Sequence, residues 1–151
     1  MGNFLVTKEV EFDAGHRVPN HESKCRNPHG HRYRVRICVI GKLVDKSGAS
    51  DEGMVIDFGN LKALLVEYVH DPLDHGFIVY EGDQQLLECF EGTHLYEWKV
   101  IEFPYIPTAE NLALWCYEQL HPHVRRMNLH LISVDVWETP TSTATYTSED
   151  M

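Results

Sequence analysis

The sequence predicts a single α+β domain in which an antiparallel sheet carries two main helices on one face. Strands with alternating apolar residues occur in pairs near both ends of the chain, and two helical segments lie between those pairs. The 151 residues, 43% of them apolar, suit one compact core. We therefore treat residues 1–151 as one domain; they contain no internal repeat or low-complexity segment.

The first strand pair is predicted from alternation. Residues 4–12 alternate apolar and charged side chains, and residues 31–44 do the same, with Tyr33, Val35 and Ile37 on one face. Because side chains two apart on a strand share a face, one face of this sheet is buried. The other face meets water or another subunit.

Each of the two main helices has a predicted start. Asp57 is a plausible N-cap for the first helix, whose apolar residues follow helical spacing as far as Val69. The second helix is expected to start at Thr108, directly after Pro107, and its apolar face runs to Leu120.

An irregular insert at 80–106 separates the two helices. We expect short strands at 77–80 and 99–103, with a short helix at 83–90 between them. Two final strands, at about 129–139 and 143–148, complete the sheet.

Charge and composition exclude several classes of function. The net charge of −10 argues against a nucleic-acid partner, because phosphate binding needs clustered Lys and Arg. No apolar run approaches the roughly 20 residues of a membrane span, and residues 1–9 lack the apolar core of a signal peptide. The four cysteines form no CxxC pair, so we expect a cytoplasmic protein without disulfides.

Three histidines suggest a metal site. His29 and His31 flank Gly30 at the start of the second strand, so their imidazoles point to one face. His16 follows the first strand, and antiparallel pairing would bring it beside them. Three imidazoles with a free fourth position are typical of catalytic zinc. The alternative is that these are solvated loop histidines; His21 and the remaining histidines are interpreted as surface or structural.

Three further features could carry chemistry. Cys25 precedes His29 by four residues and could be a base or nucleophile, a metal ligand or a buried apolar residue. In Asp74-His75, the carboxylate could fix the imidazole tautomer and raise its basicity. Glu138, at the end of a strand, could accept two hydrogen bonds from a guanidine-like ligand edge, or could simply be an exposed acid.

Six ordered motifs resemble the family of 6-pyruvoyl-tetrahydropterin synthase and 6-carboxytetrahydropterin synthase (the QueD family of queuosine biosynthesis). They are Phe12–His16 (FDAGH), Cys25–His31 (CRNPHGH), Val55–Phe58 (VIDF, followed by Leu61-Lys62), Leu73–His75 (LDH), Pro107–Asn111 (PTAEN) and Glu138–Thr139 (ET). The resemblance extends over residues 12–146. Two departures are the residues after Asp74-His75, and the segment 80–106, which is longer than in short bacterial members.

The resemblance implies a role for each motif. His16, His29 and His31 would hold zinc, with the substrate side chain completing its coordination. Cys25 would be the general base, in a proton relay with Asp74 and His75. Glu138 would anchor the 2-amino and N3 edge of a pterin, with Thr108 nearby. For the triphosphate group, the candidates are Arg17, Lys24 and Arg26, together with basic residues of a neighbouring subunit.

The resemblance also implies an assembly. The fold of this family is the tunnelling fold (T-fold), in which subunits join their sheets into a barrel. The expected homo-oligomer is a hexamer built from two trimers, with a tetramer as the alternative, and its active sites would lie at subunit interfaces.

Three functions follow from these patterns. The first is a zinc-dependent lyase that converts 7,8-dihydroneopterin triphosphate to 6-carboxy-5,6,7,8-tetrahydropterin, acetaldehyde and triphosphate; the alternative product is the pyruvoyl pterin. The second is a non-catalytic module that binds a pterin or a metal. The third is a structural zinc protein, for which His21 or Cys25 could supply the fourth ligand.

Overall fold

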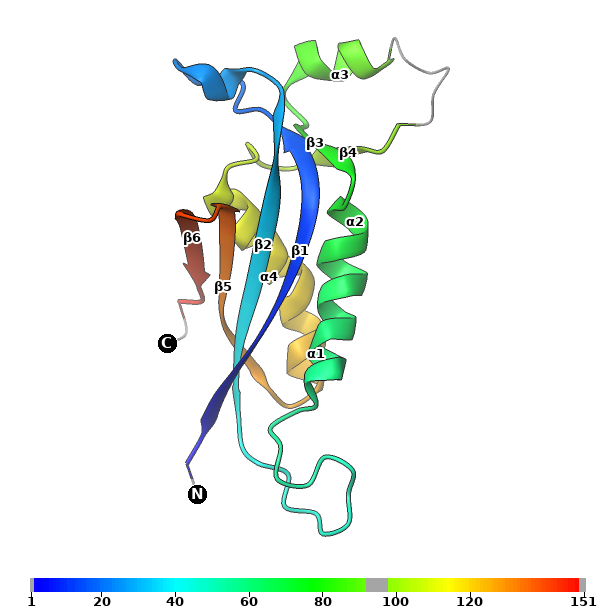
Figure 1. Cartoon of the computed structure of the whole chain (residues 1–151), viewed down its shortest axis with the longest axis vertical. Coiled ribbons are helices and arrows are strands. Elements are labelled where there is room, and N and C mark those ends of the chain that lie inside the picture. The colour runs from blue at the N-terminus through cyan, green and yellow to red at the C-terminus, as the bar shows by residue number, and fades with distance from the viewer. Residues whose placement is uncertain (1, 92–97, 150–151) are drawn as a thin grey trace.

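The computed structural model describes residues 2–91 and 98–149, which form one six-stranded sheet in the order β4-β3-β1-β2-β5-β6 (Figure 1). The strands are β1 (Phe4–His16), β2 (His29–Gly41), β3 (Gly76–Tyr80), β4 (Val100–Phe103), β5 (His130–Thr139) and β6 (Ser142–Thr147). The helices are the 3₁₀ turn η1 (Lys24–Arg26), α1 (Phe58–Leu65), the π-helical turn η2 (Val66–His70), α2 (Asp71–Leu73), α3 (Gln84–Glu91) and α4 (Ala109–Arg126).

The two central strands are thirteen residues each and pair along their whole length. Their antiparallel register places Phe12 opposite Tyr33 and His16 opposite His29. Both strands are longer toward the histidines than their apolar alternation predicts. β2 ends at Gly41, three residues before the predicted end. The hairpin therefore extends the sheet beyond its apolar core and ends in polar side chains.

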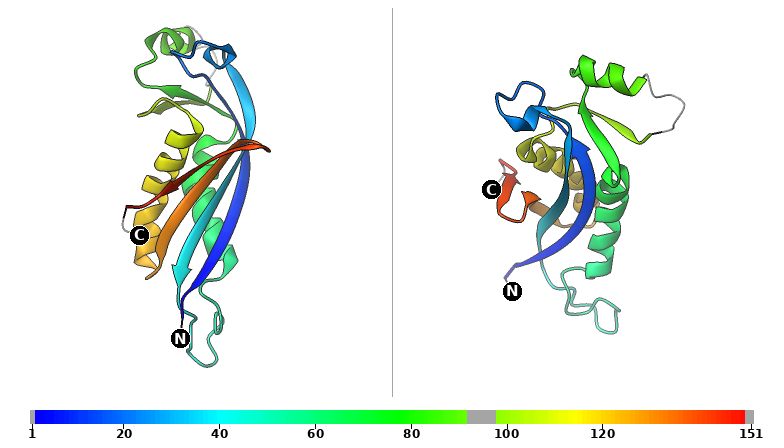
Figure 2. Two further views of the ribbon diagram at one scale, coloured as in Figure 1. Left: turned by 90° about the vertical axis from the view of Figure 1, so that its left-hand side faces the viewer. Right: turned by 45° about the horizontal axis from the view of Figure 1, so that its top comes forward.

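The two main helices cover one face of the sheet, as predicted, and α1 continues through η2 into α2 (Figures 1 and 2). The predicted N-cap Asp57 is confirmed, since Gly59 N donates to Asp57 Oδ1 at 2.6 Å. The second helix was expected to start at Thr108; it begins at Ala109, and Thr108 is its N-cap, with Asn111 N donating to Thr108 Oγ1 at 3.2 Å. The core lies between these helices and the sheet, and its largest fully buried apolar side chains include Phe12, Tyr33, Ile37, Leu61, Leu65, Phe103, Leu112 and Leu120.

The expectation of a purely antiparallel sheet is wrong, because the sheet is mixed. β3 runs parallel to β1, with Ala14 opposite Gly76, and β4 runs parallel to β3. The long helical segment α1–α2 runs alongside β1 and continues into β3, which fixes the direction of β3. The chain then passes through α3 before β4, and a crossover through a helix is what a parallel neighbour requires.

The insert at 80–106 has the strand–helix–strand order that was predicted, with residues 92–97 outside the described part of the chain. Its helix α3 is separate from α1 and α4, at the end of the molecule where β1 ends (Figure 1). Phe90 on α3 packs against Phe77, with ring centroids 5.2 Å apart. Phe77 is the register partner of Gly15, and a Cβ at Gly15 would lie 2.5 Å from the Phe77 ring. Gly15 alternates with the core-facing residues of β1, so α3 packs on the face of the sheet opposite the two main helices.

Among the helices of residues 2–91 and 98–149, none combines the length and apolarity that crossing a bilayer requires.

Candidate metal centre

Strand register and alternation bring the three predicted histidines together. His16 pairs with His29, and Ala14 pairs with His31. Directly opposed residues of an antiparallel pair share a face of the sheet, and so do residues two apart. Phe12 and Tyr33, which have the same alternation, are buried under the helices. All three imidazoles therefore project from the covered face, beyond the end of the apolar core.

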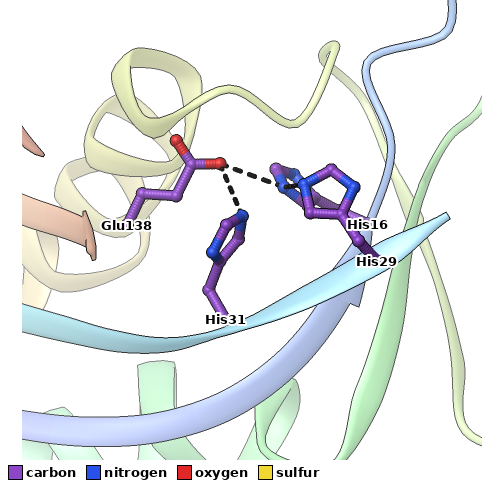
Figure 3. Close-up of side chains that lie close together, drawn as sticks. All are labelled: His16, His29, His31 and Glu138. Atoms are coloured by element: carbon purple, nitrogen blue, oxygen red, sulfur yellow. Dashed lines mark hydrogen bonds and ion pairs between the residues drawn. The ribbon is translucent and has the colours of Figure 1, made fainter. Parts of the chain in front are cut away.

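Glu138 joins them from β5. It follows Val134 and Val136 at intervals of two, and both valines are buried on the covered face. Its Oε1 lies 3.0 Å from His16 Nε2 and 3.1 Å from His31 Nε2. The four ligand atoms lie within 4.8 Å of one another, and their side chains converge on one point (Figure 3). The prediction from sequence had only the three histidines in this group, with His21 or Cys25 as alternative fourth ligands.

Two backbone carbonyls set the protonation of two of the imidazoles. His16 Nδ1 lies 2.7 Å from Pro107 O, and His29 Nδ1 lies 2.6 Å from Asn27 O. A carbonyl only accepts hydrogen bonds, so each Nδ1 carries the proton and each neutral ring leaves Nε2 with a lone pair. These two Nε2 atoms are 3.2 Å apart.

This arrangement fits a zinc ion. Two imidazole lone pairs facing each other repel unless a proton or a cation lies between them. Zinc–nitrogen bonds of about 2.0–2.1 Å in a tetrahedral site would place the ligand nitrogens about 3.3 Å apart. Nδ1–H donation to a carbonyl is also the outer contact that metal-ligating histidines usually make. The donor set and the short His16–His29 distance are therefore suited to a bound metal ion.

Burial increases the need for a cation at this point. His16 is fully buried, and His31 Nε2 is a buried atom for which no described residue provides a hydrogen bond of good geometry. Burial lowers the pKa of His31, because it penalises the charged ring more than the Glu138 carboxylate favours it. The lowered pKa of His31 favours its neutral ring, whose nitrogen lone pair is available to a metal ion.

Thr108 lies at the edge of this centre, next to Pro107. Its hydroxyl oxygen caps α4, and Asn111 Nδ2 donates to Ile106 O at 2.9 Å, which braces the same turn. The cap leaves the Thr108 hydroxyl proton free to donate to a ligand. The PTAEN motif thus positions both the Pro107 carbonyl and this hydroxyl.

A hollow of about 430 Å³ leads to the centre from the uncovered face of the sheet. Pairing between β2 and β5 begins at Arg34 and Trp137, so the strand ends that carry His31 and Glu138 diverge beyond that point. Both residues line the hollow, together with Trp137 and Arg34, whose guanidinium carbon lies 4.0 Å from the indole centroid. A ligand can therefore reach Glu138 and His31 through the gap between the two strands.

The Asp74-His75 turn is held by hydrogen bonds but does not contact the centre in the described part of the chain. Asp74 Oδ2 lies 2.7 Å from His75 Nδ1, and this contact is the main reason that the Asp74 pKa is lowered. Asp74 Oδ1 accepts from Asp13 N, and His75 N donates to Asp13 O. His75 has φ = 59°, and its side chain is 78% exposed. It lines a hollow of about 440 Å³ on the uncovered face, beside Asp13, Gly15 and Arg32, and His31 of the metal centre lines the same hollow.

Cys25 is half-buried in the loop that joins β1 to β2, and it is not part of the metal-ligand group. Val18 N donates to Cys25 O at 2.9 Å across the base of this loop. His21 is exposed, and its Nδ1 accepts from Ser23 N. Neither candidate for a fourth ligand thus lies in the group, and the fourth side chain beside the three histidines is Glu138.

Of the three candidates for triphosphate binding, Arg17 already has a carboxylate partner. Its guanidinium makes two contacts to Asp83, at 2.7 and 2.5 Å. Lys24 and Arg26 lie on η1 with exposed side chains. The Lys24 and Arg26 side chains are therefore exposed to solvent, whereas Arg17 is paired with Asp83 within the protein.

Some parts of the site have no side-chain signature and could not be predicted from the sequence. The residue types Asn27 and Pro107 do not indicate that their backbone carbonyls accept hydrogen bonds from His29 and His16. Asp83 was one acid among many. The alternation Val134, Val136, Glu138 was the one available signal that Glu138 faces the histidines, since it puts the acid on the buried face.

A sheet covered by two helices, with three imidazoles and a carboxylate converging at its end, defines an α+β protein with a group that can hold a metal ion. Comparison with known proteins specifies it further. The profile of the 6-pyruvoyl tetrahydropterin synthase family matches residues 5–149, and this chain belongs to that family.

Curated relatives match over nearly the whole chain. The 6-carboxy-5,6,7,8-tetrahydropterin synthase of Haemophilus influenzae is 34% identical over 143 residues, which are 95% of this chain and 98% of the relative. The enzyme of the same name from Synechocystis is 37% identical over 145 residues, 96% of this chain and 94% of the relative.

Solved structures agree with the fold. An uncharacterized protein from Wolinella succinogenes superposes with a TM-score of 0.80 at 26% identity, covering 99% of this chain and 100% of that one. The 6-pyruvoyl tetrahydropterin synthase of Caenorhabditis elegans gives 0.70 at 23% identity, with 99% and 98% coverage. These structural neighbours have the T-fold, and the resemblance found in the sequence motifs is confirmed.

Proposed function

We propose that this chain is a zinc-dependent 6-carboxy-5,6,7,8-tetrahydropterin synthase. It would act on 7,8-dihydroneopterin triphosphate and release acetaldehyde and triphosphate, the reaction that serves queuosine biosynthesis. The observation that carries the proposal is the convergence of His16, His29 and His31 on one point, with Nδ1–H of two of them held by carbonyls. Curated relatives with the matching name, aligned over almost the full chain, support the choice of reaction.

Zinc, when bound by the three imidazoles, would supply Lewis acidity toward hydroxyl groups of the substrate side chain. The protein residues then have separate tasks. Glu138 faces both the histidines and the hollow, so its carboxylate can accept hydrogen bonds from the 2-amino and N3 edge of a pterin. Thr108, at the edge of the centre, would donate its free hydroxyl proton.

Proton transfer is assigned to Cys25 and to the Asp74-His75 pair. The short contact between Asp74 and His75 Nδ1 fixes the tautomer and leaves His75 Nε2 to exchange a proton. Cys25 Sγ would take a proton from the substrate side chain as the general base. Both groups are outside the metal-ligand set, as acid–base residues should be.

We also propose that two copies of the chain complete each active site. His31 of the metal centre lines two adjoining hollows, and the His75 side chain at the edge of one of them is largely exposed and does not belong to the metal-ligand group of its own chain. A neighbouring copy would present its Asp74-His75 turn to the metal centre of the first. A homo-oligomer, with a hexamer favoured over a tetramer, provides such interfaces by symmetry. Four free thiols are consistent with the reducing cytoplasm as its location.

The decisive experiment incubates the zinc-loaded protein with 7,8-dihydroneopterin triphosphate and measures acetaldehyde and triphosphate together. Release of both supports the carboxy product. Triphosphate without acetaldehyde would assign the pyruvoyl product instead, and neither would indicate a non-catalytic binding module. Cys25→Ala should abolish turnover while the zinc content stays at the wild-type level; turnover in that variant would refute the assignment of the base.

A further inference from the structure

We infer that the insert between β3 and α4 braces both halves of the proton-transfer unit: Asp83 holds the loop with Cys25, and Lys99 holds the Asp74-His75 turn. This inference rests on the catalytic roles proposed above for those three residues. It gives Asp83 and Lys99 positioning roles, since neither is placed against the substrate.

The first of the two bracing contacts is a bidentate ion pair between Arg17 and Asp83. The Asp83 carboxylate accepts from Arg17 Nε at 2.7 Å and from Arg17 Nη2 at 2.5 Å, and the Asp83 side chain is only 4% exposed. Its Oδ1 also accepts from Leu86 N in the first turn of α3. A bidentate guanidinium–carboxylate pair that is largely shielded from water has a fixed geometry, unlike most surface ion pairs. Arg17 is thereby fixed to the start of α3.

Arg17 is the residue at which the Cys25 loop leaves the sheet. It follows His16 directly, and its other neighbour, Val18, donates its N–H to Cys25 O. The loop residues 20–24 and 26–28 are exposed, so they bury little side chain that could fix the loop. The ion pair to Asp83 thus lies one residue from the hydrogen bond that closes the loop on Cys25. We expect the position of the thiol to depend on it.

The second bracing contact is made by the ammonium of Lys99, at the other end of the insert. Lys99 Nζ donates to Asp71 O at 2.6 Å and to Asp74 O at 2.7 Å. Carbonyls at a helix C-terminus lack partners within the helix and carry partial negative charge, so a cation there both pairs and stabilises them. Lys99 O also accepts from Phe77 N, two residues beyond His75.

The turn needs such support because of its backbone. His75 has φ = 59°, a left-handed conformation that non-glycine residues seldom adopt because it is sterically unfavourable. Lys99 binds the carbonyl that precedes this residue and the amide two residues after it. The left-handed conformation, and with it the direction of the imidazole, is therefore held from both sides by one residue of the insert.

The test uses two variants of the full chain in its zinc-loaded form, Asp83→Asn and Lys99→Met. Asn keeps the size of Asp83 but loses the charge, and Met keeps the length of Lys99 but not its donors. We expect kcat to fall about tenfold or more in each, the order of loss that sub-ångström to 1 Å misplacement causes, with KM changed by less than about threefold. Zinc content should stay at the wild-type level.

Two measurements distinguish the Asp83 contact from the Lys99 contact without relying on turnover. Iodoacetamide labelling of Cys25, followed by peptide mass spectrometry, should be accelerated several-fold, about threefold or more, in Asp83→Asn and unchanged in Lys99→Met. Amide hydrogen exchange across residues 74–80 should be accelerated in Lys99→Met and unchanged in Asp83→Asn. Lys99→Arg, which can still donate to two carbonyls, should restore most of kcat and of the exchange protection.

The controls are Gln84→Ala, which removes an exposed contact to Glu88 on the same helix, and Glu102→Gln on the exposed side of β4. Both should match the wild type in all readouts. Labelling of Cys25 at the wild-type rate in Asp83→Asn, or wild-type exchange in Lys99→Met, would overturn the inference. A wild type without turnover would instead refute the proposed function, while the labelling and exchange data would still decide whether the insert braces both segments.

Discussion

The histidine cluster and the Asp74-His75 turn differ in how the chain holds them. The cluster lies on the ends of the two longest strands and on β5, under the helices, with His16 fully buried. The turn is exposed, has a left-handed residue and is tied to its surroundings mainly through backbone groups. The comparison teaches that the metal group of the proposed site is built within one chain, whereas the Asp74-His75 part of its acid–base residues is presented outward.

The largest expected effect is on the cluster. His29→Ala removes one of three imidazoles at a half-buried strand end, so the fold should persist while zinc affinity falls at least about 100-fold and turnover is lost. Competition with a chromophoric chelator measures the affinity. His130→Ala, an exposed histidine of β5, is the matched control. Wild-type zinc affinity in His29→Ala would mean that the metal lies elsewhere.

A smaller but more specific effect tests where the turn acts. His29→Ala and His75→Ala should each be inactive alone. In mixed oligomers, a site that takes its cluster from one copy and its turn from a neighbour is intact in about a quarter of cases, half for each partner. Co-expression with two purification tags isolates the mixed species. If isolated mixed oligomers have no activity, both halves of each site come from the same chain.

A third prediction concerns pH. The pKa of Asp74 is lowered in the folded chain, chiefly by its hydrogen bond to His75, below its ordinary value of 3.8. Its contribution to stability is therefore complete above that value and is lost as pH falls through the lower, folded value. The gap in unfolding free energy between wild type and Asp74→Asn should shrink as the pH falls below about 4. Urea titrations at several pH values measure this gap, and a gap that widens in acid would contradict the assignment.

The smallest effect is expected beneath the cluster. The Tyr33 hydroxyl is buried, and no described residue accepts or donates a hydrogen bond to it. An unsatisfied buried hydroxyl gives no net stabilisation, so Tyr33→Phe should change the free energy of unfolding by less than about 1 kcal/mol. Denaturant unfolding measures this change, with Tyr146→Phe, at a half-buried tyrosine of β6, as a comparison. A loss above about 2 kcal/mol would show that the hydroxyl has a partner in solution, such as an ordered water.

Local signals in the sequence were sufficient for much of the fold. These signals are the alternation in β1 and β2, the N-cap at Asp57, the boundary before Thr108 and the spacing His29-Gly30-His31. Each acts over a few residues, and the structure has all of them. Glu138 was chosen as a site residue, but its place among the histidines depends on β5 lying next to β2, a contact between residues about a hundred positions apart.

Strand direction and the face reached by the turn were harder to infer. β3 and β4 are five and four residues long, and nothing in so short a run encodes whether its neighbour is parallel. The left-handed backbone conformation at His75 could not be predicted, because the residue is not a glycine. Asp83 gains its partner only because α3 packs over Phe77, a tertiary contact without a sequence pattern of its own. These features depend on tertiary packing rather than on local propensity.

The carbonyls of Pro107 and Asn27 that orient His16 and His29 also bear on how the protein can change over evolutionary time. A main-chain acceptor survives almost any substitution at its own position, provided that the backbone path is kept. Side chains at these two positions can therefore drift without altering which imidazole nitrogen faces the metal. Selection on this part of the centre acts on the shape of two turns, so distant relatives can keep its chemistry while losing resemblance in the residues next to it.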